Sequence, residues 1–421
     1  MLKVIRAITN NNYMFSIVNK VFSILCGLIT TALINRFLGS ELKGEYSYII
    51  NIVNIVVVVA NLGIYQSYSY YKREKVENQL SRYINIFFFQ AMIYLILSII
   101  LSCFLKVNKY VVALFMIPIQ VLAQQLSMVI LIEIIKFRQK LNFIMIFINL
   151  LLVVCVYSFC PQNIVFIMYV SIIKDFIAVI VYLIKIKYIP NPLNIDKVFF
   201  KQLIKFGTLP MITAILINLN YKVDIFVLKD FVSNSEIGLY STGAALAEYA
   251  WLIPDAFKDV LFSKTAKDDS VNETVFCIKI SFFIILIFFL GMILFGKMFI
   301  KMLYGNEYIS SYNVTCLIFM GIPSMILYKL IGPLFVAKGK QRFYFYVLLS
   351  SVISNIVLNF LLIPIWGKEG AAIASIISYS ISGIPFYIRF INEYNIRWYQ
   401  PLIIEKNDVK KFKKIIEGIK L

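Results

Sequence analysis

Histidine is absent from the 421 residues, and only 15% of them are charged. The lack of histidine removes the commonest general base, the commonest zinc ligand and every Ser/His or Cys/His nucleophile arrangement. The six cysteines are scattered without metal-ligand spacing, mostly inside apolar runs, which is typical of small hydrophobic residues. We therefore predict that the chain is not an enzyme and that it needs no metal or other cofactor.

What the sequence has in abundance is apolar surface. Hydrophobic residues make up 61% of the chain and aromatic residues 16%, a composition that a soluble globular protein does not carry. Apolar runs of about 20 residues, long enough to cross the hydrocarbon core of a bilayer as helices, recur along the whole sequence. They are expected near residues 14–35, 46–70, 83–105, 110–133, 142–160, 163–186, 207–229, 237–260, 274–296, 310–337, 343–364 and 369–391. The sequence thus predicts an all-α integral membrane protein with about 12 transmembrane helices in two six-helix lobes.

The net charge of +19 has two possible origins, nucleic-acid binding and membrane topology. Most Lys and Arg residues fall in alternate loops between the predicted helices, as the positive-inside rule requires. This asymmetry predicts that both termini are cytoplasmic and that no nucleic acid is bound.

The chain is expected to divide at a polar stretch that contains Pro190, Pro192 and Asp196. The predicted parts are an N-terminal lobe (1–190), a cytoplasmic linker (191–206), a C-terminal lobe (207–391) and a basic cytoplasmic tail (392–421). Within the tail, Asp408–Leu421 has an apolar helical face opposed by lysines, and we expect it to lie on the membrane surface.

An internal duplication is visible after the first predicted helix of each lobe. Phe37, Gly44, Tyr46 and Ser47 recur at the same spacing as Phe231, Gly238, Tyr240 and Ser241. A second echo, Lys140-x-x-Phe143 against Lys340-x-x-Phe343, precedes the fifth helix of each lobe. If it is not chance similarity, the duplication relates the lobes by an axis along the membrane normal, with a transport path between them.

Charged residues inside membrane helices cost about 2.5–3.5 kcal/mol each at the bilayer centre, so they must face water, one another or a substrate. Five lysines are candidates for a cationic lumen that receives an anionic substrate: Lys20, Lys174, Lys222, Lys279 and Lys329. Three carboxylates are candidates for a coupling ion: Asp175, Asp224 and Glu248. Interhelical pairing, such as Lys174 with Asp224, is the alternative, and Lys20 and Lys279 lie close enough to helix ends to be ordinary anchors. Lys222 and Asp224 are about 200° apart around a helix, so one of them is expected to face a neighbouring helix.

Uncharged polar residues also recur at helical spacing. Asn51, Asn54 and Asn61 share a face of the second predicted helix, and Asn355 and Asn359 share a face of the eleventh. Such stripes suit hydrogen bonding to sugar hydroxyls, but small and polar residues also hold membrane helices together.

Several motifs resemble those of a known family. They are Phe335-Val-Ala-Lys-Gly-Lys-Gln-Arg342, Leu362-Ile-Pro-x-Trp-Gly-Lys-Glu-Gly-Ala-Ala-Ile-Ala374, Ile237-Gly-Leu-Tyr-Ser241 and the N-terminal Arg36-Phe-Leu-Gly39. Together they resemble the Wzx-type O-antigen and polysaccharide flippases, within the superfamily of multidrug, oligosaccharidyl-lipid and polysaccharide exporters. The resemblance implies a V-shaped, MATE-like pair of lobes in the bacterial inner membrane. It also implies alternating-access transport of undecaprenyl-diphosphate-linked oligosaccharide, such as an O-antigen repeat unit, from the cytoplasmic to the periplasmic leaflet.

Lysines in the lumen would replace the water shell of the diphosphate, and a carboxylate could bind a coupling proton or sodium ion. Expected partners are the lipid-linked oligosaccharide, membrane lipid and other polysaccharide-assembly proteins. One alternative is a MATE-like exporter of drugs or organic cations, for which a surplus of lumen carboxylates is expected. Another is a membrane polysaccharide polymerase, an enzyme that would need a large outer loop, whereas the predicted outer loops are short. No motif indicates the sugar, the coupling ion, the oligomeric state or the species.

Overall fold

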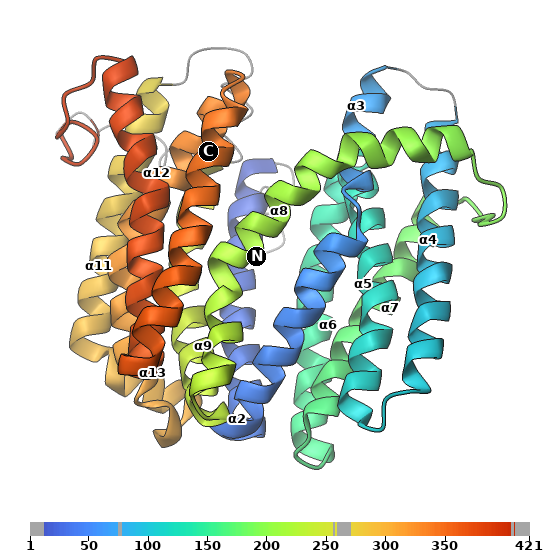
Figure 1. The fold of residues 1–421 in the computed structure, drawn as a ribbon, viewed down its shortest axis with the longest axis horizontal. Helices are drawn as coiled ribbons and strands as arrows, with labels where there is room; N and C mark the ends of the chain where they lie inside the picture. The colour runs from blue at the N-terminus through green and yellow to red at the C-terminus, as the bar shows by residue number, and fades with distance from the viewer. Residues whose placement is uncertain (1–11, 75–77, 256, 259–270, 406–407, 409–421) are drawn as a thin grey trace, which may run out of the picture. The chain divides into compact units, whose positions relative to one another are not determined.

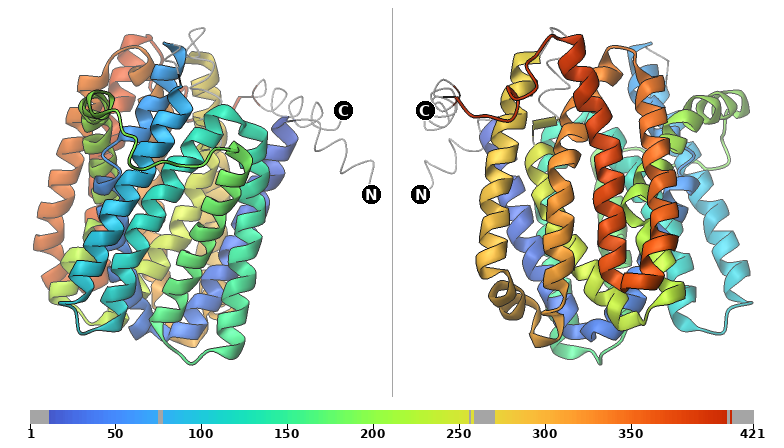
Figure 2. Two further views of the ribbon diagram at one scale, coloured as in Figure 1. Left: turned by 90° about the vertical axis from the view of Figure 1, so that its right-hand side faces the viewer. Right: turned by 60° about the vertical axis from the view of Figure 1, so that its left-hand side comes forward.

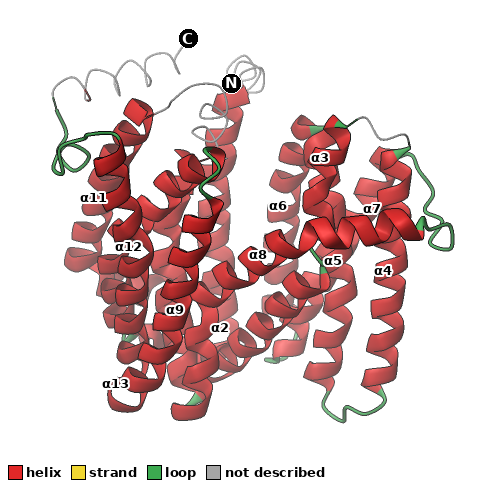
Figure 3. Ribbon diagram, turned by 45° about the horizontal axis from the view of Figure 1, so that its top comes forward, coloured by secondary structure: helices red, strands yellow, loops and turns green. Residues whose placement is uncertain are grey.

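The structure is a computed structural model, and it describes residues 12–74, 78–255, 257–258, 271–405 and 408. Every regular element within these ranges is a helix (Figure 3). In chain order they are α2 (Asn12–Ala60), η1 (Ile64–Ser67), α3 (Tyr68–Arg73), α4 (Gln79–Ser102), α5 (Asn108–Glu133), α6 (Ile135–Phe159), α7 (Ile164–Ile186), α8 (Lys197–Phe231), α9 (Asn234–Glu248), η2 (Tyr249–Trp251), α11 (Val271–Tyr304), η3 (Asn306–Tyr308), α12 (Ser311–Ala337) and α13 (Gln341–Glu393) (Figure 1).

Within the described ranges, nine helices are long and apolar enough to cross a membrane. Two of them contain a break: α2 leaves helical geometry at Gly39 (φ 68°, ψ 174°) and α13 at Gly367 (φ 55°, ψ −131°). Glycine permits both conformations, which L-residues with a side chain rarely adopt. Each broken helix therefore supplies two spans, and α9 with η2 covers the predicted eighth. The all-α membrane class is confirmed, and the helices are consistent with the predicted twelve spans.

The predicted duplication coincides with two breaks in the backbone. Alignment of Phe37 with Phe231 places Gly39 opposite Ser233. Ser233 separates α8 from α9 with an extended backbone (φ −66°, ψ 158°), and its side chain accepts a hydrogen bond from the Glu236 amide as an N-cap. The repeat therefore marks the turn between the first and second helices of each half.

The chain forms two compact units, one of residues Ser16–Leu219 and one of Asn220–Leu421 with Met1–Phe15. The division falls inside α8, which continues as one helix from Lys197 instead of following a 191–206 linker. Phe199 and Leu203 explain this early start, because both are buried in the apolar core of the first unit. The predicted tail helix from residue 409 onward lies outside the described residues.

In the first unit, α5 packs against α4, α6 and α7 (Figure 2, left). The first unit has two apolar clusters of buried residues. One includes Phe87 and Leu126, and the other includes Val53 and Met168. The outward side chains of α4, including Ile96 and Ile99, are about half exposed, as a lipid-facing surface requires.

In the second unit, α12 packs against α11, α9 and both halves of α13 (Figure 2, right). Small residues permit the closest approach between α12 and α13. A Cβ atom added to Gly383 would lie 2.0 Å from the carbonyl oxygen of Ser324, so the two backbones are in direct contact there.

We expect Gly383→Ala to lower stability, because the added methyl group would push α13 away from α12. Such overpacking costs roughly 1–3 kcal/mol. The matched control is Gly291→Ala in α11, where an added Cβ meets no atom within 4 Å. The control should be neutral or stabilising by up to about 1 kcal/mol, since Ala is the better helix former. Thermal unfolding of the detergent-solubilised protein measures both, and equal melting temperatures for the two variants would contradict the close contact.

Candidate functional site

A charged pocket lies in the second unit where α9 gives way to η2. Pro254, one turn beyond η2, cannot donate a backbone hydrogen bond, and the chain tightens to a 3₁₀ turn just before it. The pocket has a volume of about 370 Å³. Its walls are Ala245, Glu248, Tyr249, Trp251, Leu252 and Asp255.

Two ion pairs border this pocket. The Nζ of Lys222, from α8, donates to both carboxylate oxygens of Glu248 at 2.8 and 3.0 Å. The Nζ of Lys329, from α12, donates to both oxygens of Asp255 at 2.8 and 2.9 Å. Each carboxylate of the wall thus has its own lysine, so the pocket carries two cations without a surplus of negative charge.

Lys329 is the more buried of the two lysines. The Lys329 side chain is 9% exposed, and its Nζ lies 4.9 Å from the centre of the Trp251 ring and 6.0 Å from that of Tyr221. Ring faces stabilise a cation that has lost much of its water. Lys329 is therefore held in place by a carboxylate and by aromatic faces together.

The structure brings three predicted residues together here, Lys222, Glu248 and Lys329, and adds Asp255 and Trp251. The sequence contains a signal for both additions. Trp251 and Asp255 follow Glu248 by three and seven positions, which places them on the same helix face. The predicted helix 237–260 included both residues, but neither was among the predicted site residues.

A second polar cluster surrounds Asp224, which is 1% exposed. Its carboxylate accepts hydrogen bonds from Asn359 Nδ2 at 2.6 Å, from Ser375 Oγ at 2.7 Å and from the Tyr240 hydroxyl. Asn355 donates to Ser378 in the adjoining layer, at 2.8 Å. Asp224 thus faces α9 and α13.

No Lys or Arg nitrogen lies within ion-pair distance of Asp224 in the part of the chain that the structure describes. The Oδ1 atom of the buried Asn359 also lacks a hydrogen-bond partner there. The cluster is therefore rich in oxygen atoms around a single carboxylate, a donor set that suits a proton or a hard monovalent cation. None of Tyr240, Ser375 and Ser378 was predicted to contact Asp224. The repeat marked the position of Tyr240 only, and a single serine in a membrane helix carries no distinguishing signal.

The duplication extends to this cluster. Tyr46, which aligns with Tyr240, forms a hydrogen bond with Ser171 of α7 in the first unit. The second unit has the corresponding contact between Tyr240 and Ser375 of α13, at 3.4 Å. The same alignment places Thr30 opposite Asp224, so only the second unit carries a carboxylate at this position.

The other predicted charges lie elsewhere. Lys279 is 4% exposed and contacts the C-terminal segment, with Nζ 2.8 Å from Asp408 Oδ2 and 3.7 Å from Glu405 Oε1. Lys174 and Asp175 are neighbours on α7 and lie 3.3 Å apart, Nζ to Oδ1. Lys20 is in α2, and its side chain lies outside the described part of the structure.

The asparagines of the first unit make different contacts. Asn51 donates to the Ser47 carbonyl at 2.7 Å, one turn back on its own helix. Asn61 donates to the Val57 carbonyl and to Gln124 Oε1, both at 2.9 Å, and so joins the end of α2 to α5. Asn54 is exposed. Of this stripe, Asn54 therefore has the side chain most available to a ligand.

The sequence matches the model of a family described as "polysaccharide biosynthesis protein" over residues 33–313, well over half of the chain. The chain belongs to this family. One relative is the capsular polysaccharide biosynthesis protein CapF of Staphylococcus aureus. Its sequence is 23% identical to this one over 270 residues, which are 62% of this chain. The match spans 63% of the length of that relative.

This member of the polysaccharide biosynthesis protein family has the same fold as several solved structures. The lipid II flippase MurJ in an inward closed conformation matches with a TM-score of 0.68 and 16% identity, over 91% of this chain and 87% of that one. An inward-facing multidrug resistance MATE transporter of the MOP superfamily matches with a TM-score of 0.68 and 12% identity, over 91% of this chain and 98% of that one. These matches show the fold that the resemblance to polysaccharide flippases implied, and the long apolar helices are those of a multi-pass membrane protein.

Proposed function

We propose that this protein flips a polyprenyl-diphosphate-linked oligosaccharide, such as an O-antigen or capsule repeat unit on undecaprenyl diphosphate, from the cytoplasmic to the periplasmic leaflet. The observation that carries the proposal is the match to polysaccharide biosynthesis proteins in a chain with the fold of a lipid flippase. Membership of a biosynthetic family favours a lipid-linked saccharide over a drug as cargo. Transport is by alternating access in a bacterial inner membrane, with both termini cytoplasmic and other polysaccharide-assembly proteins as partners.

The charge of the pocket favours this cargo over the organic cations of a drug exporter. Glu248 and Asp255 are each neutralised by a lysine, so the pocket offers no unpaired carboxylate to a cationic drug. Lys222 and Lys329 have paired, partly dehydrated ammonium groups that can exchange a carboxylate for a diphosphate oxygen. The aromatic walls, Tyr249 and Trp251, suit the apolar faces of sugar rings.

We propose further that Asp224 binds the coupling ion, a proton or Na⁺. A carboxylate that changes charge inside a buried network gives the ion different affinities in two conformations, which is what coupling requires. Glu248 and Asp175 are weaker candidates because each has a lysine within ion-pair distance.

Removal of the Lys222 ion pair from the pocket tests the proposed cargo. We expect Lys222→Gln with Glu248→Gln to stop export of surface polysaccharide and to leave the protein at normal abundance, since both charges of the pair are removed together. In vesicles, translocation of a fluorescent polyprenyl-diphosphate glycan should fall at least ten-fold, because a dehydrated diphosphate gains about 1.5–3 kcal/mol from this cation. The control is Lys229→Gln, an exposed lysine of α8. Normal polysaccharide in the double variant would refute the role of Lys222 in transport.

A further inference from the structure

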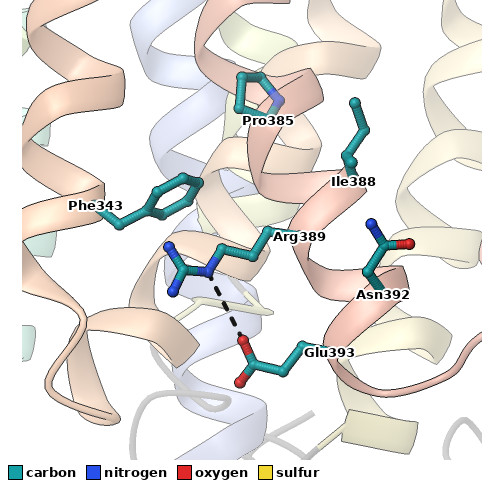
Figure 4. Close-up of a pocket in the computed structure, with 6 residues that line it drawn as sticks. All are labelled: Phe343, Pro385, Ile388, Arg389, Asn392 and Glu393. Atoms are coloured by element: carbon teal, nitrogen blue, oxygen red, sulfur yellow. Dashed lines mark ion pairs between the residues drawn. The ribbon is translucent and has the colours of Figure 1, made fainter.

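A pocket of about 630 Å³ opens at the C-terminal end of α13, away from the charged pocket described above (Figure 4). Phe343 comes from the first turn of α13, and the other lining residues come from its last turns, which the break at Gly367 folds back beside it. They are Pro385, Ile388, Arg389, Asn392 and Glu393. The pocket is therefore apolar along Phe343, Pro385 and Ile388 and polar at the helix end.

Arg389 is positioned by aromatic rings and not by a strong ion pair. Its guanidinium carbon lies 4.4 Å from the centre of the Phe343 ring and 5.8 Å from that of Phe335. Its Nε is 3.9 Å from Glu393 Oε2, at the outer limit of an ion pair (Figure 4). The other Glu393 oxygen contacts Lys340 directly. Within the described ranges the guanidinium donates no hydrogen bond. Its planar set of N–H donors is therefore available to a ligand, and the arrangement is typical of phosphate recognition.

The surroundings are basic. Lys338 lies over the Tyr394 ring, Lys340 contacts Glu393, and Arg342 is exposed beside Phe343. With Arg389, these cations outnumber the single carboxylate of the pocket, Glu393. The positive-inside rule places the 338–342 loop on the cytoplasmic side, where the leaflet carries anionic lipids.

We propose that this pocket binds an anionic membrane phospholipid. The phosphate lies on the Arg389 guanidinium and the Asn392 amide, and an acyl chain runs over Phe343, Pro385 and Ile388. Ile388 is 50% exposed on a membrane-spanning helix, so the apolar end of the pocket opens where an acyl chain would be. This lipid is a resident of the bilayer and not the transported cargo, so the site does not depend on the proposed function.

Native mass spectrometry of the full chain tests the proposal, with dioleoyl-phosphatidylglycerol and dioleoyl-phosphatidylcholine as the probes. We expect the wild type to retain the anionic lipid roughly five- to ten-fold more tightly, and Arg389→Gln to lose that preference. Arg397→Gln, the same change of charge at an exposed residue that does not line the pocket, should keep it. Ile388→Trp should weaken retention of the lipid by filling the apolar end, and it leaves Arg389 in place.

Three outcomes would overturn the proposal. The first is an undiminished preference for phosphatidylglycerol in Arg389→Gln with unaltered thermal unfolding. The second is equal retention of the two lipids by the wild type. The third is displacement of phosphatidylglycerol by millimolar inorganic phosphate, since a free anion does not occupy the apolar wall.

Discussion

Asp224→Asn is expected to reduce transport to about 1% or less of the wild-type rate, since it removes a buried charge from the centre of the second unit. The amide keeps the shape of the side chain but presents N–H groups to a site where Asn359, Ser375 and Tyr240 already donate. Donors that lose their acceptor in a buried site cost about 1–3 kcal/mol each, so Asp224→Ala should also lower the free energy of unfolding by roughly 3 kcal/mol or more.

The dependence of transport on an ion gradient distinguishes a loss of ion coupling from a loss of structure in the Asp224 variant. Uptake of the lipid-linked glycan is measured with imposed Na⁺ or proton gradients, and Asp224→Asn should respond to neither. Ser351→Ala is the control, since it removes hydrogen bonds to Asn220 and Ser378 in the same buried layer without touching the carboxylate. It should cost about 1 kcal/mol and keep its response to the gradient. A stable Asp224→Asn protein with wild-type ion dependence would rule out Asp224 as the coupling group.

The helices could be predicted from the sequence because apolar length alone defines a membrane span. Their connections were less predictable. Residues 36–45 and 365–368 were expected to be loops, whereas the chain passes through each as a kink at one glycine, Gly39 or Gly367. Polar side chains in short turns look the same in sequence whether the backbone ends a helix or only bends it. The early start of α8 was missed for a related reason, because Phe199 and Leu203 are apolar for packing against the first unit and not for lipid.

Some residues of the candidate site could likewise be recognised from the sequence, and others could not. Charges deep in apolar runs are costly, so Lys222, Asp224, Glu248 and Lys329 were recognisable, and the structure shows all four engaged in the second unit. Their partners were not recognisable, since a pairing such as Lys329 with Asp255 depends on which helices are neighbours. Tyr240 is a partial exception. The duplication marked it by alignment with Tyr46, although nothing in the repeat indicated that its hydroxyl meets Asp224.

Lys329→Gln should abolish transport. A second substitution at its partner, Asp255, distinguishes a role of Lys329 in neutralising Asp255 from a role in binding the cargo. If Lys329 only neutralises Asp255, the single variant fails because it leaves an unpaired carboxylate beside Trp251. This defect costs less than the roughly 3–5 kcal/mol of a fully buried pair, because the Asp255 side chain is 38% exposed. The double variant Lys329→Gln with Asp255→Asn removes both charges and should then regain activity. If Lys329 instead binds the diphosphate, the double variant regains stability but not transport.

We expect the second result. Thermal unfolding should show the double variant within about 1 kcal/mol of the wild type, with glycan translocation still reduced at least ten-fold. Lys329→Arg keeps a cation over the Trp251 ring and should retain a measurable fraction of the rate. Recovery of full transport in the double variant would show that a neutral side chain at this position suffices and that the pair is structural. Because Lys329 is the most deeply buried cation of the pocket, its need for a charge during transport is the strictest test of an anionic cargo.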